Sequence, residues 1–162
     1  MSKDAEREQV TIERTFDGAT PTEVWELWTT KAGMESWWGP EGFAVNVHTL
    51  DVRPGGTLAY AMTAVDPAQA EFMKRAGMPT TTETRGRYSV VEPPRRLVFT
   101  QLADFIPGVE PYDIETTVDF LATSGGVRLV IQIDRMHDAV WTEMAVKGWE
   151  SQLGRLAKAL AA

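Results

Sequence analysis

A chain of 162 residues, 43% of them hydrophobic, can bury one substantial core, which favours a single domain. A net charge of −7 and the lack of any stretch near the ~20 apolar residues of a membrane span argue against nucleic acids and membranes as partners. The absence of cysteine excludes disulfides, thiolate metal sites and a cysteine nucleophile, and it fits a reducing cytoplasm, where we expect the protein.

The N-terminal segment predicts a tail followed by a strand. Residues 1–9 are mostly charged or polar and are interpreted as a flexible tail, which leaves residues 10–162 as one domain. The stretch VTIERTF (10–16) alternates apolar and polar side chains, as a half-buried strand does. No repeat, linker or low-complexity tract follows, so nothing in the composition indicates a second domain.

Two short helices are predicted next. Thr20 and Glu23 have the spacing of a capping box, and Pro21 occupies the first helical position, so a helix starts here. A second short helix ends at the adjacent pair Trp37 and Trp38. Neighbouring side chains point about 100° apart on a helix and to opposite faces of a strand, so these two indoles cannot fill one site.

The middle of the chain predicts strands interrupted by one inserted helix. Residues 43–52 and 57–65 flank the sequence RPGG, a turn that favours a hairpin. Asp66 followed by Pro67 predicts the start of a helix near residues 67–76. Four more strands are predicted at 80–92, 96–104, 112–124 and 127–134.

A long amphipathic helix is predicted from about Asp138 to Ala161. Its apolar stripe needs a large apolar surface, and one face of the sheet is the surface of that size. We therefore predict an α+β fold, in which a curved antiparallel sheet of about six or seven strands wraps around the C-terminal helix. The stripe contains Trp141, Ala145, Trp149, Gln152, Leu153, Leu156 and Leu160.

Five motifs carry a family resemblance that runs from about residue 10 to residue 160. They are P-x-x-VW-x-x-WT (21–29), M-x-x-WWGP (34–40), D-x-RPGG (51–56), GRYSVVEPPRRLVFT (86–100) and GW (148–149). Together they resemble the domain shared with the activator of heat-shock-protein-90 ATPase, a member of the START-like (SRPBCC) helix-grip superfamily. The resemblance implies a helix-grip fold with a cavity between the sheet and the C-terminal helix, which usually binds a small apolar ligand.

The sequence departs from the usual family pattern in two places. Residues 66–79 form an insert where a tight turn is common, and Gln101 stands where many relatives carry an aromatic residue. Phe72 and Met73 in this insert are suited to a lid over the cavity, because methionine adapts to varied shapes and a short helix is weakly held. A helix that merely covers the end of the sheet is the alternative.

Strand parity and the helical stripe predict the residues that line the cavity. Of the two adjacent tryptophans, we expect one to anchor the short helices and the other to line the cavity mouth. Polar members of the set, together with Thr84, must pair with one another or be satisfied by water and a ligand, since an unpaired buried polar group costs about 1–3 kcal/mol. The predicted set is Trp37, Trp38, Tyr60, Met62, Tyr88, Phe99, Gln101, Thr116, Val118, Phe120, Trp141, Trp149 and Gln152.

Gly148 interrupts the predicted C-terminal helix, where glycine is about 1 kcal/mol less favourable than alanine. Either the helix packs closely on a strand at this point, or the glycine leaves room for a ligand. The sequence does not decide between the two.

These observations predict a binding protein for a small, mostly apolar molecule. The first alternative is a cyclase- or hydrolase-like enzyme in which Tyr60 and Gln101 orient a carbonyl substrate, and the second is a chaperone-interacting module like the family's namesake. His48 and His137 have no metal-binding spacing, and no nucleophile or phosphate-loop motif is present. We therefore predict no catalytic residues, no metal and no cofactor, and the sequence leaves a homodimer open.

Overall fold

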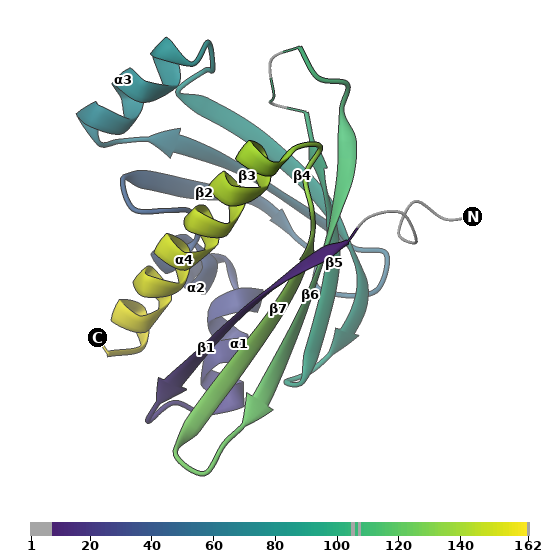
Figure 1. Ribbon diagram of the computed structural model, residues 1–162. Helices are drawn as coiled ribbons and strands as arrows, with labels where there is room; N and C mark the ends of the chain where they lie inside the picture. Colours follow the sequence, from purple (N-terminus) through teal and green to yellow (C-terminus); the bar gives the residue numbers. More distant parts are fainter. Residues whose placement is uncertain (1–7, 105, 107, 162) are drawn as a thin grey trace.

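The computed structural model describes residues 8–104, 106 and 108–161, which form one strongly curved antiparallel sheet with four helices (Figure 1). The sheet has seven strands in the order β1-β7-β6-β5-β4-β3-β2, so β1 and β2 are its edges. The predicted α+β helix-grip architecture is thereby confirmed. The strands are β1 (Gln9–Asp17), β2 (Phe43–Leu50), β3 (Thr57–Ala64), β4 (Thr81–Glu92), β5 (Arg96–Ala103), β6 (Tyr112–Ala122) and β7 (Gly126–Asp134).

The predicted N-terminal tail lies almost entirely outside the described residues. Gln9, which was assigned to that tail, begins β1 and pairs with Asp134 of β7. Within the described part of the chain, no helix is long and apolar enough to cross a membrane.

All four predicted helices are present, and α1 and α3 begin where their caps predict. They are α1 (Pro21–Thr29), α2 (Lys31–Trp37), α3 (Pro67–Arg75) and α4 (Ala139–Ala161). At α1 both halves of the capping box form, with the Glu23 N–H donating to Thr20 Oγ1 at 3.2 Å and the Thr20 N–H donating to Glu23 Oε1 at 3.0 Å. Asp66 and Asp138 accept bonds from the first turns of α3 and α4 in the same way.

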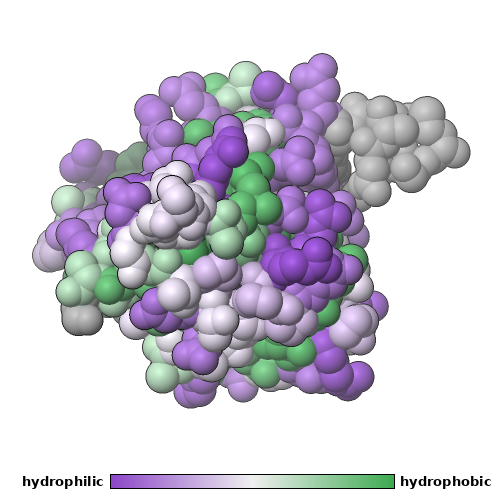
Figure 2. Space-filling model, turned by 90° about the horizontal axis from the view of Figure 1, so that it is seen from below, coloured by the Kyte–Doolittle hydropathy of each residue, from purple (hydrophilic) through white to green (hydrophobic). Residues whose placement is uncertain are grey.

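The long helix α4 crosses the concave face of the sheet, while α1 and α2 close one end of it (Figure 1). The other short helix, α3, joins β3 to β4 at the opposite end. Figure 2 views the molecule from below, where polar and apolar side chains are interspersed on the surface. Helices α1 and α2 therefore pack at one end of the sheet, and the short inserted helix α3 lies at the other end.

An aromatic cluster fills the end of the grip where α1, α2 and α4 meet. The Trp28 ring lies 4.9 Å from Trp37 and 5.3 Å from Trp38, measured between ring centroids, and stacks on Trp149 at 5.9 Å. Phe120 of β6 completes the cluster at 5.7 Å from Trp28. Aromatic side chains bury large apolar areas, so this end of the concave face is solid core.

The edge strand β2 is protected by side chains of α2. The Val47 N–H donates to Glu35 Oε2 at 2.8 Å, and Lys31 Nζ donates to the Val47 carbonyl at 3.2 Å. The bond from Val47 lowers the pKa of Glu35, with a smaller contribution from the nearby ammonium of Lys31. Two side chains thus occupy edge positions that another strand would otherwise pair with.

Candidate functional site

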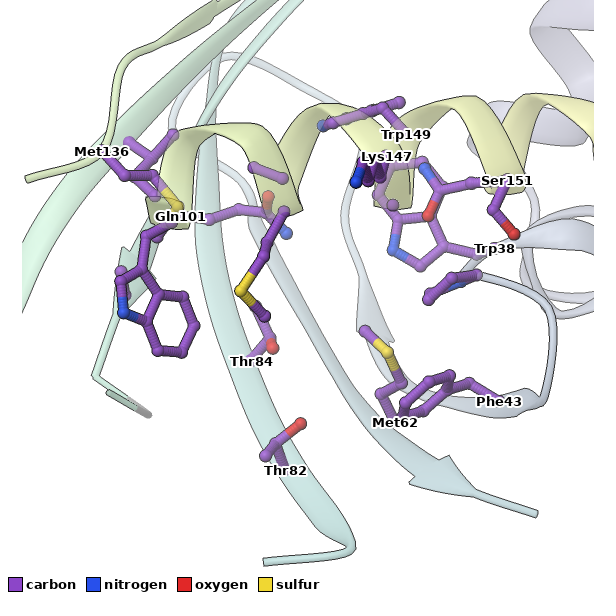
Figure 3. A pocket seen from close by; sticks show the side chains of 18 of the residues that line it. Trp38, Phe43, Met62, Thr82, Thr84, Gln101, Met136, Lys147, Trp149 and Ser151 are labelled. Carbon is purple, nitrogen blue, oxygen red and sulfur yellow. The ribbon is translucent and has the colours of Figure 1, made fainter. Parts of the chain in front are cut away.

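A pocket of about 590 Å³ lies between α4 and the sheet, at the end that the aromatic cluster does not fill (Figure 3). Its walls come from α4, from β3 to β7, from α3 and from the loop between α2 and β2. This volume lies within the range of roughly 300–1,000 Å³ that is usual for pockets binding small molecules.

Methionine dominates the apolar lining of the pocket. Five of the seven methionines in the sequence contribute to it, namely Met62, Met73, Met78, Met136 and Met144. The thioether side chain is unbranched and polarisable, so it fits irregular and varied surfaces. The lining therefore suits apolar ligands of more than one shape.

A small group of polar side chains faces the same space. Gln101 Nε2 donates to Tyr60 Oη at 2.9 Å, and Trp38 and Thr84 also hydrogen-bond this phenol. The sheet allows this arrangement because Tyr60 pairs with Thr84 across β3 and β4.

Burial keeps the Tyr60 phenol protonated. Desolvation raises its pKa, and the hydrogen bonds from Trp38, Gln101 and Thr84 offset this increase in part. At neutral pH the group is therefore a neutral hydroxyl that positions its neighbours, and a phenolate base is not available there.

Gly86 makes room for Gln101. An ideal Cβ at Gly86 would lie 2.6 Å from the Thr100 carbonyl oxygen and 3.2 Å from Gln101 Cγ. Any larger residue at this position would clash with the Thr100 backbone carbonyl and crowd the side chain of Gln101.

Three residues of α4 hold the loop between α2 and β2 against the helix. Arg155 Nη1 donates to the carbonyls of Trp38, Gly39, Pro40 and Phe43 at 2.9–3.3 Å. Gln152 Oε1 accepts from the Gly39 N–H at 2.8 Å, and Ser151 Oγ accepts from the Glu41 N–H at 2.9 Å. We call Ser151, Gln152 and Arg155 the loop clamp, and it fixes one wall of the pocket.

The sequence did not identify Arg155 as a site residue. Its carbonyl partners precede it by 112 to 117 positions, and no local motif connects positions so far apart. The available signal was an arginine three residues after Gln152, at the border of the apolar stripe.

Most residues predicted to line the cavity do contact the pocket. These are Trp38, Tyr60, Met62, Gln101, Thr116, Trp141, Trp149 and Gln152, together with Thr84 and the two residues of the predicted lid, Phe72 and Met73. Gln152 differs in part from its predicted role, because its carbonyl oxygen binds the Gly39 N–H and so supports the protein's own loop.

Five predicted lining residues lie elsewhere, and their assignment is corrected. Parity placed the four strand residues on the helix-facing side of the sheet, but aromatic rings of α1 and α2 occupy space above that part of it. Phe120, for example, packs at 5.1 Å against Trp25. Trp37 lies on α2 and is the one of the two tryptophans that anchors the short helices. Trp37, Tyr88, Phe99, Val118 and Phe120 are buried in the core and do not line the pocket.

The adjacent tryptophans pack edge to face, with ring centroids 5.0 Å apart, but they have different roles. Trp37 is fully buried and donates its indole N–H to the Leu27 carbonyl at 2.8 Å, which ties α2 to α1. Trp38 follows the end of α2 in an extended conformation and faces the pocket (Figure 3).

Gly148 borders open space within the pocket. No heavy atom lies within 4 Å of an ideal Cβ at this position. Close packing of α4 on a strand therefore does not explain the glycine, and its missing side chain adds to the pocket volume.

No group of three acidic, histidine or cysteine residues among those described could hold a metal ion. His137 contacts the Tyr112 hydroxyl through Nδ1 at 2.8 Å, and neither histidine lines the pocket. The polar groups of the pocket are thus neutral side chains such as Tyr60 and Gln101, together with the charged Glu41, Asp134 and Lys147, set in an apolar wall.

Comparison with known proteins gives one family and one fold. The family model described as "Activator of Hsp90 ATPase homolog 1-like protein" matches residues 18–161. No curated protein matches the chain. A solved structure from Chromobacterium violaceum superposes with a TM-score of 0.76 at 25% identity, covering 93% of this chain and 95% of the other.

Two further structures show the same fold. The AHSA1 protein from Silicibacter pomeroyi gives a TM-score of 0.73 at 24% identity, covering 94% of this chain and 97% of its own. A protein from Rhodobacter sphaeroides gives 0.73 at 23% identity, with coverage of 95% and 92%.

Proposed function

Since the chain belongs to the Activator of Hsp90 ATPase homolog 1-like family and has its helix-grip fold, we propose that it binds a small, mostly apolar molecule in the pocket under α4. The observation that carries the proposal is the open volume of about 590 Å³ beside Gly148, at a place where the fold could have been filled by side chains. A protein core is normally packed to near crystal density, so a space of this size favours an occupant.

The lining supports an apolar occupant that varies in shape. Five methionines and the rings of Trp38, Trp141 and Trp149 contribute to its apolar walls. Burying apolar ligand surface against such walls contributes about 25 cal/mol per Å² before the entropic costs of binding. The loop clamp preorganises one wall, which reduces the ordering that a ligand must impose.

The proposal is tested by titrating the protein with N-phenyl-1-naphthylamine, a neutral apolar fluorophore. We expect saturable binding with one site per chain and a change in tryptophan emission, because three tryptophans line the pocket. Calorimetry provides an independent measurement. No saturable binding by either method would contradict a ligand-binding role.

An enzymatic role of the cyclase or hydrolase kind is supported by the Tyr60 and Gln101 pair alone. A carbonyl substrate would need Gln101 or Tyr60 as a hydrogen-bond donor. Turnover of such a substrate that is abolished by Tyr60→Phe would favour this alternative.

A chaperone-binding role is supported by the description of the family. If this role extends to the present chain, the chain would bind purified Hsp90 and increase the ATPase rate of Hsp90. Absence of both effects, with ligand binding intact, would leave the binding function alone.

A further inference from the structure

We infer that the ligand carries an uncharged hydroxyl group on its apolar body, and that this group contacts the amide of Gln101, with the amide of Gln152 as a further polar group in the same pocket. The inference rests on the proposed binding function and specifies the chemical class of the ligand. It follows from the hydrogen-bonding capacity that remains unused in the pocket and from the charges around it.

Gln152 offers a donor to the pocket. The residue is 7% exposed, and its carbonyl oxygen is committed to the Gly39 N–H, which can only donate, so the amide must present its nitrogen on the other side. None of the described residues accepts a hydrogen bond from this nitrogen. Among the described residues, this nitrogen is not one of the fully buried unpaired atoms, so it borders the open space of the pocket, where a ligand acceptor can bind it.

Gln101 offers an acceptor. Its nitrogen donates to Tyr60, and within the described ranges no group donates to its carbonyl oxygen. Figure 3 shows the Gln101 side chain directly under α4, in the interior of the pocket. The pocket therefore presents unused amide donors and at least one unused acceptor, the Gln101 carbonyl oxygen, all of them neutral.

The charges that line the pocket disfavour an anionic ligand. Two acids, Glu41 and Asp134, face one base, Lys147. Lys147 is mostly exposed and pairs with Glu143 at 3.3 Å, while the guanidinium of Arg155 is committed to the loop carbonyls. A carboxylate placed beside Gln101 would thus be desolvated without a cationic partner, which is strongly unfavourable.

A hydroxyl group matches both amides because it can donate to Gln101 Oε1 or accept from Gln152 Nε2. A pure hydrocarbon leaves both groups unpaired, an ether satisfies the donor alone, and a carboxylate lacks the proton that Gln101 requires. Neutral alcohols and phenols are the ligand class that these side chains select.

The test compares four ligands that share one ring system: 2-naphthol, 2-methoxynaphthalene, naphthalene and 2-naphthoate. Each is measured by displacement of N-phenyl-1-naphthylamine and by calorimetry. We expect 2-naphthol to bind about three- to tenfold more tightly than the ether and the hydrocarbon, the effect of one net hydrogen bond. The carboxylate should bind at least about tenfold more weakly than 2-naphthol.

Gln101→Met tests the assignment to this residue, since it keeps the apolar bulk and removes the amide. We expect the preference for 2-naphthol over the ether to disappear while naphthalene binds unchanged. Gln132→Met is the matched control, because Gln132 lies on β7 outside the pocket lining. It should keep the preference.

The outcomes separate the two proposals. Failure of the fluorophore and all four ligands to bind would overturn the binding function itself. Binding of the fluorophore without a preference for 2-naphthol, or with tighter binding of the carboxylate, would overturn the inference alone. The wild-type ligand series decides this even if Gln101→Met fails to fold.

Discussion

Substitutions at Gly148 test directly whether the space under α4 is open. An ideal Cβ at this position meets no heavy atom within 4 Å, so alanine fits without strain. Alanine is more favourable than glycine inside a helix by about 1 kcal/mol. For a chain of this size that change raises the melting temperature by about 2–4 °C. We therefore expect Gly148→Ala to be more stable than the wild type.

A larger side chain at the same position should separate stability from binding. Gly148→Leu places four carbon atoms in the pocket of about 590 Å³, where they contact apolar walls and displace ligand volume. We expect the variant to fold with at least wild-type stability and to lose about tenfold or more in affinity for N-phenyl-1-naphthylamine. The measurements are thermal denaturation followed by circular dichroism and a fluorescence titration.

Gly154→Ala is the matched control on the same helix. Its Cβ would lie 3.9 Å from Arg14 Nη1, an ordinary contact outside the pocket, so it should gain stability and keep wild-type affinity. Destabilisation by Gly148→Ala would show that packed atoms occupy the space. Unchanged affinity in Gly148→Leu would show that the fluorophore binds elsewhere.

Three further predictions concern the loop clamp, the β2 edge and the inserted helix. Arg155→Met removes the donor to four carbonyls and should lower the free energy of unfolding, measured by urea denaturation, by about 1–3 kcal/mol. Lys158→Met on the same helix is the control and should change this free energy little. Equal effects of the two substitutions would contradict the role of the loop clamp. The pKa of Glu35 is lowered in the folded state, so the stabilisation by its carboxylate is present above the ordinary pKa of 4.5 and is lost as the pH falls through the folded pKa. The difference in the free energy of unfolding between wild type and Glu35→Gln should therefore narrow below pH 4.5, and a constant difference would contradict this. The lid role of α3 is tested at Phe72, which is 52% exposed. Phe72→Ala should speed dissociation of the fluorophore in stopped-flow measurements and change the melting temperature little. A lower melting temperature with an unchanged dissociation rate would identify α3 as structural cover of the sheet end.

Local signals in the sequence determined most of the fold. The caps at Thr20 and Asp66 each involve residues three positions apart, and the alternation within a strand needs only its own residues. Such signals fix the identity of elements, their approximate ends and the face that each one buries. They therefore predicted the sheet, the inserted helix and the C-terminal helix.

Local sequence signals could not predict which residues on the concave face of the sheet belong to the core and which line the pocket. Phe99 and Gln101 lie two residues apart on β5 and point to the same side, yet Phe99 is core and Gln101 lines the pocket. The two residues differ because the aromatic cluster of α1, α2 and α4 extends along the sheet as far as Phe99 and stops before Gln101. How far the cluster extends depends on contacts between segments more than a hundred residues apart, which strand parity does not encode.

The boundary between core and pocket coincides with the dipeptide Trp37-Trp38. α2 ends at Trp37, and the two indoles pack edge to face at 5.0 Å. Trp37 ties α2 to α1, and Trp38 lies against Tyr60 beside the open space. Trp38 also packs against Trp28 and Trp149 of the cluster, at 5.3 and 5.5 Å. A side chain that belongs to the core on one face and to the pocket on the other is held rigidly before any ligand arrives. The pair of large apolar residues is thus explained by its position between core and pocket: Trp37 and the aromatic cluster support Trp38 from the core side, and Trp38 forms part of the pocket wall on the other side.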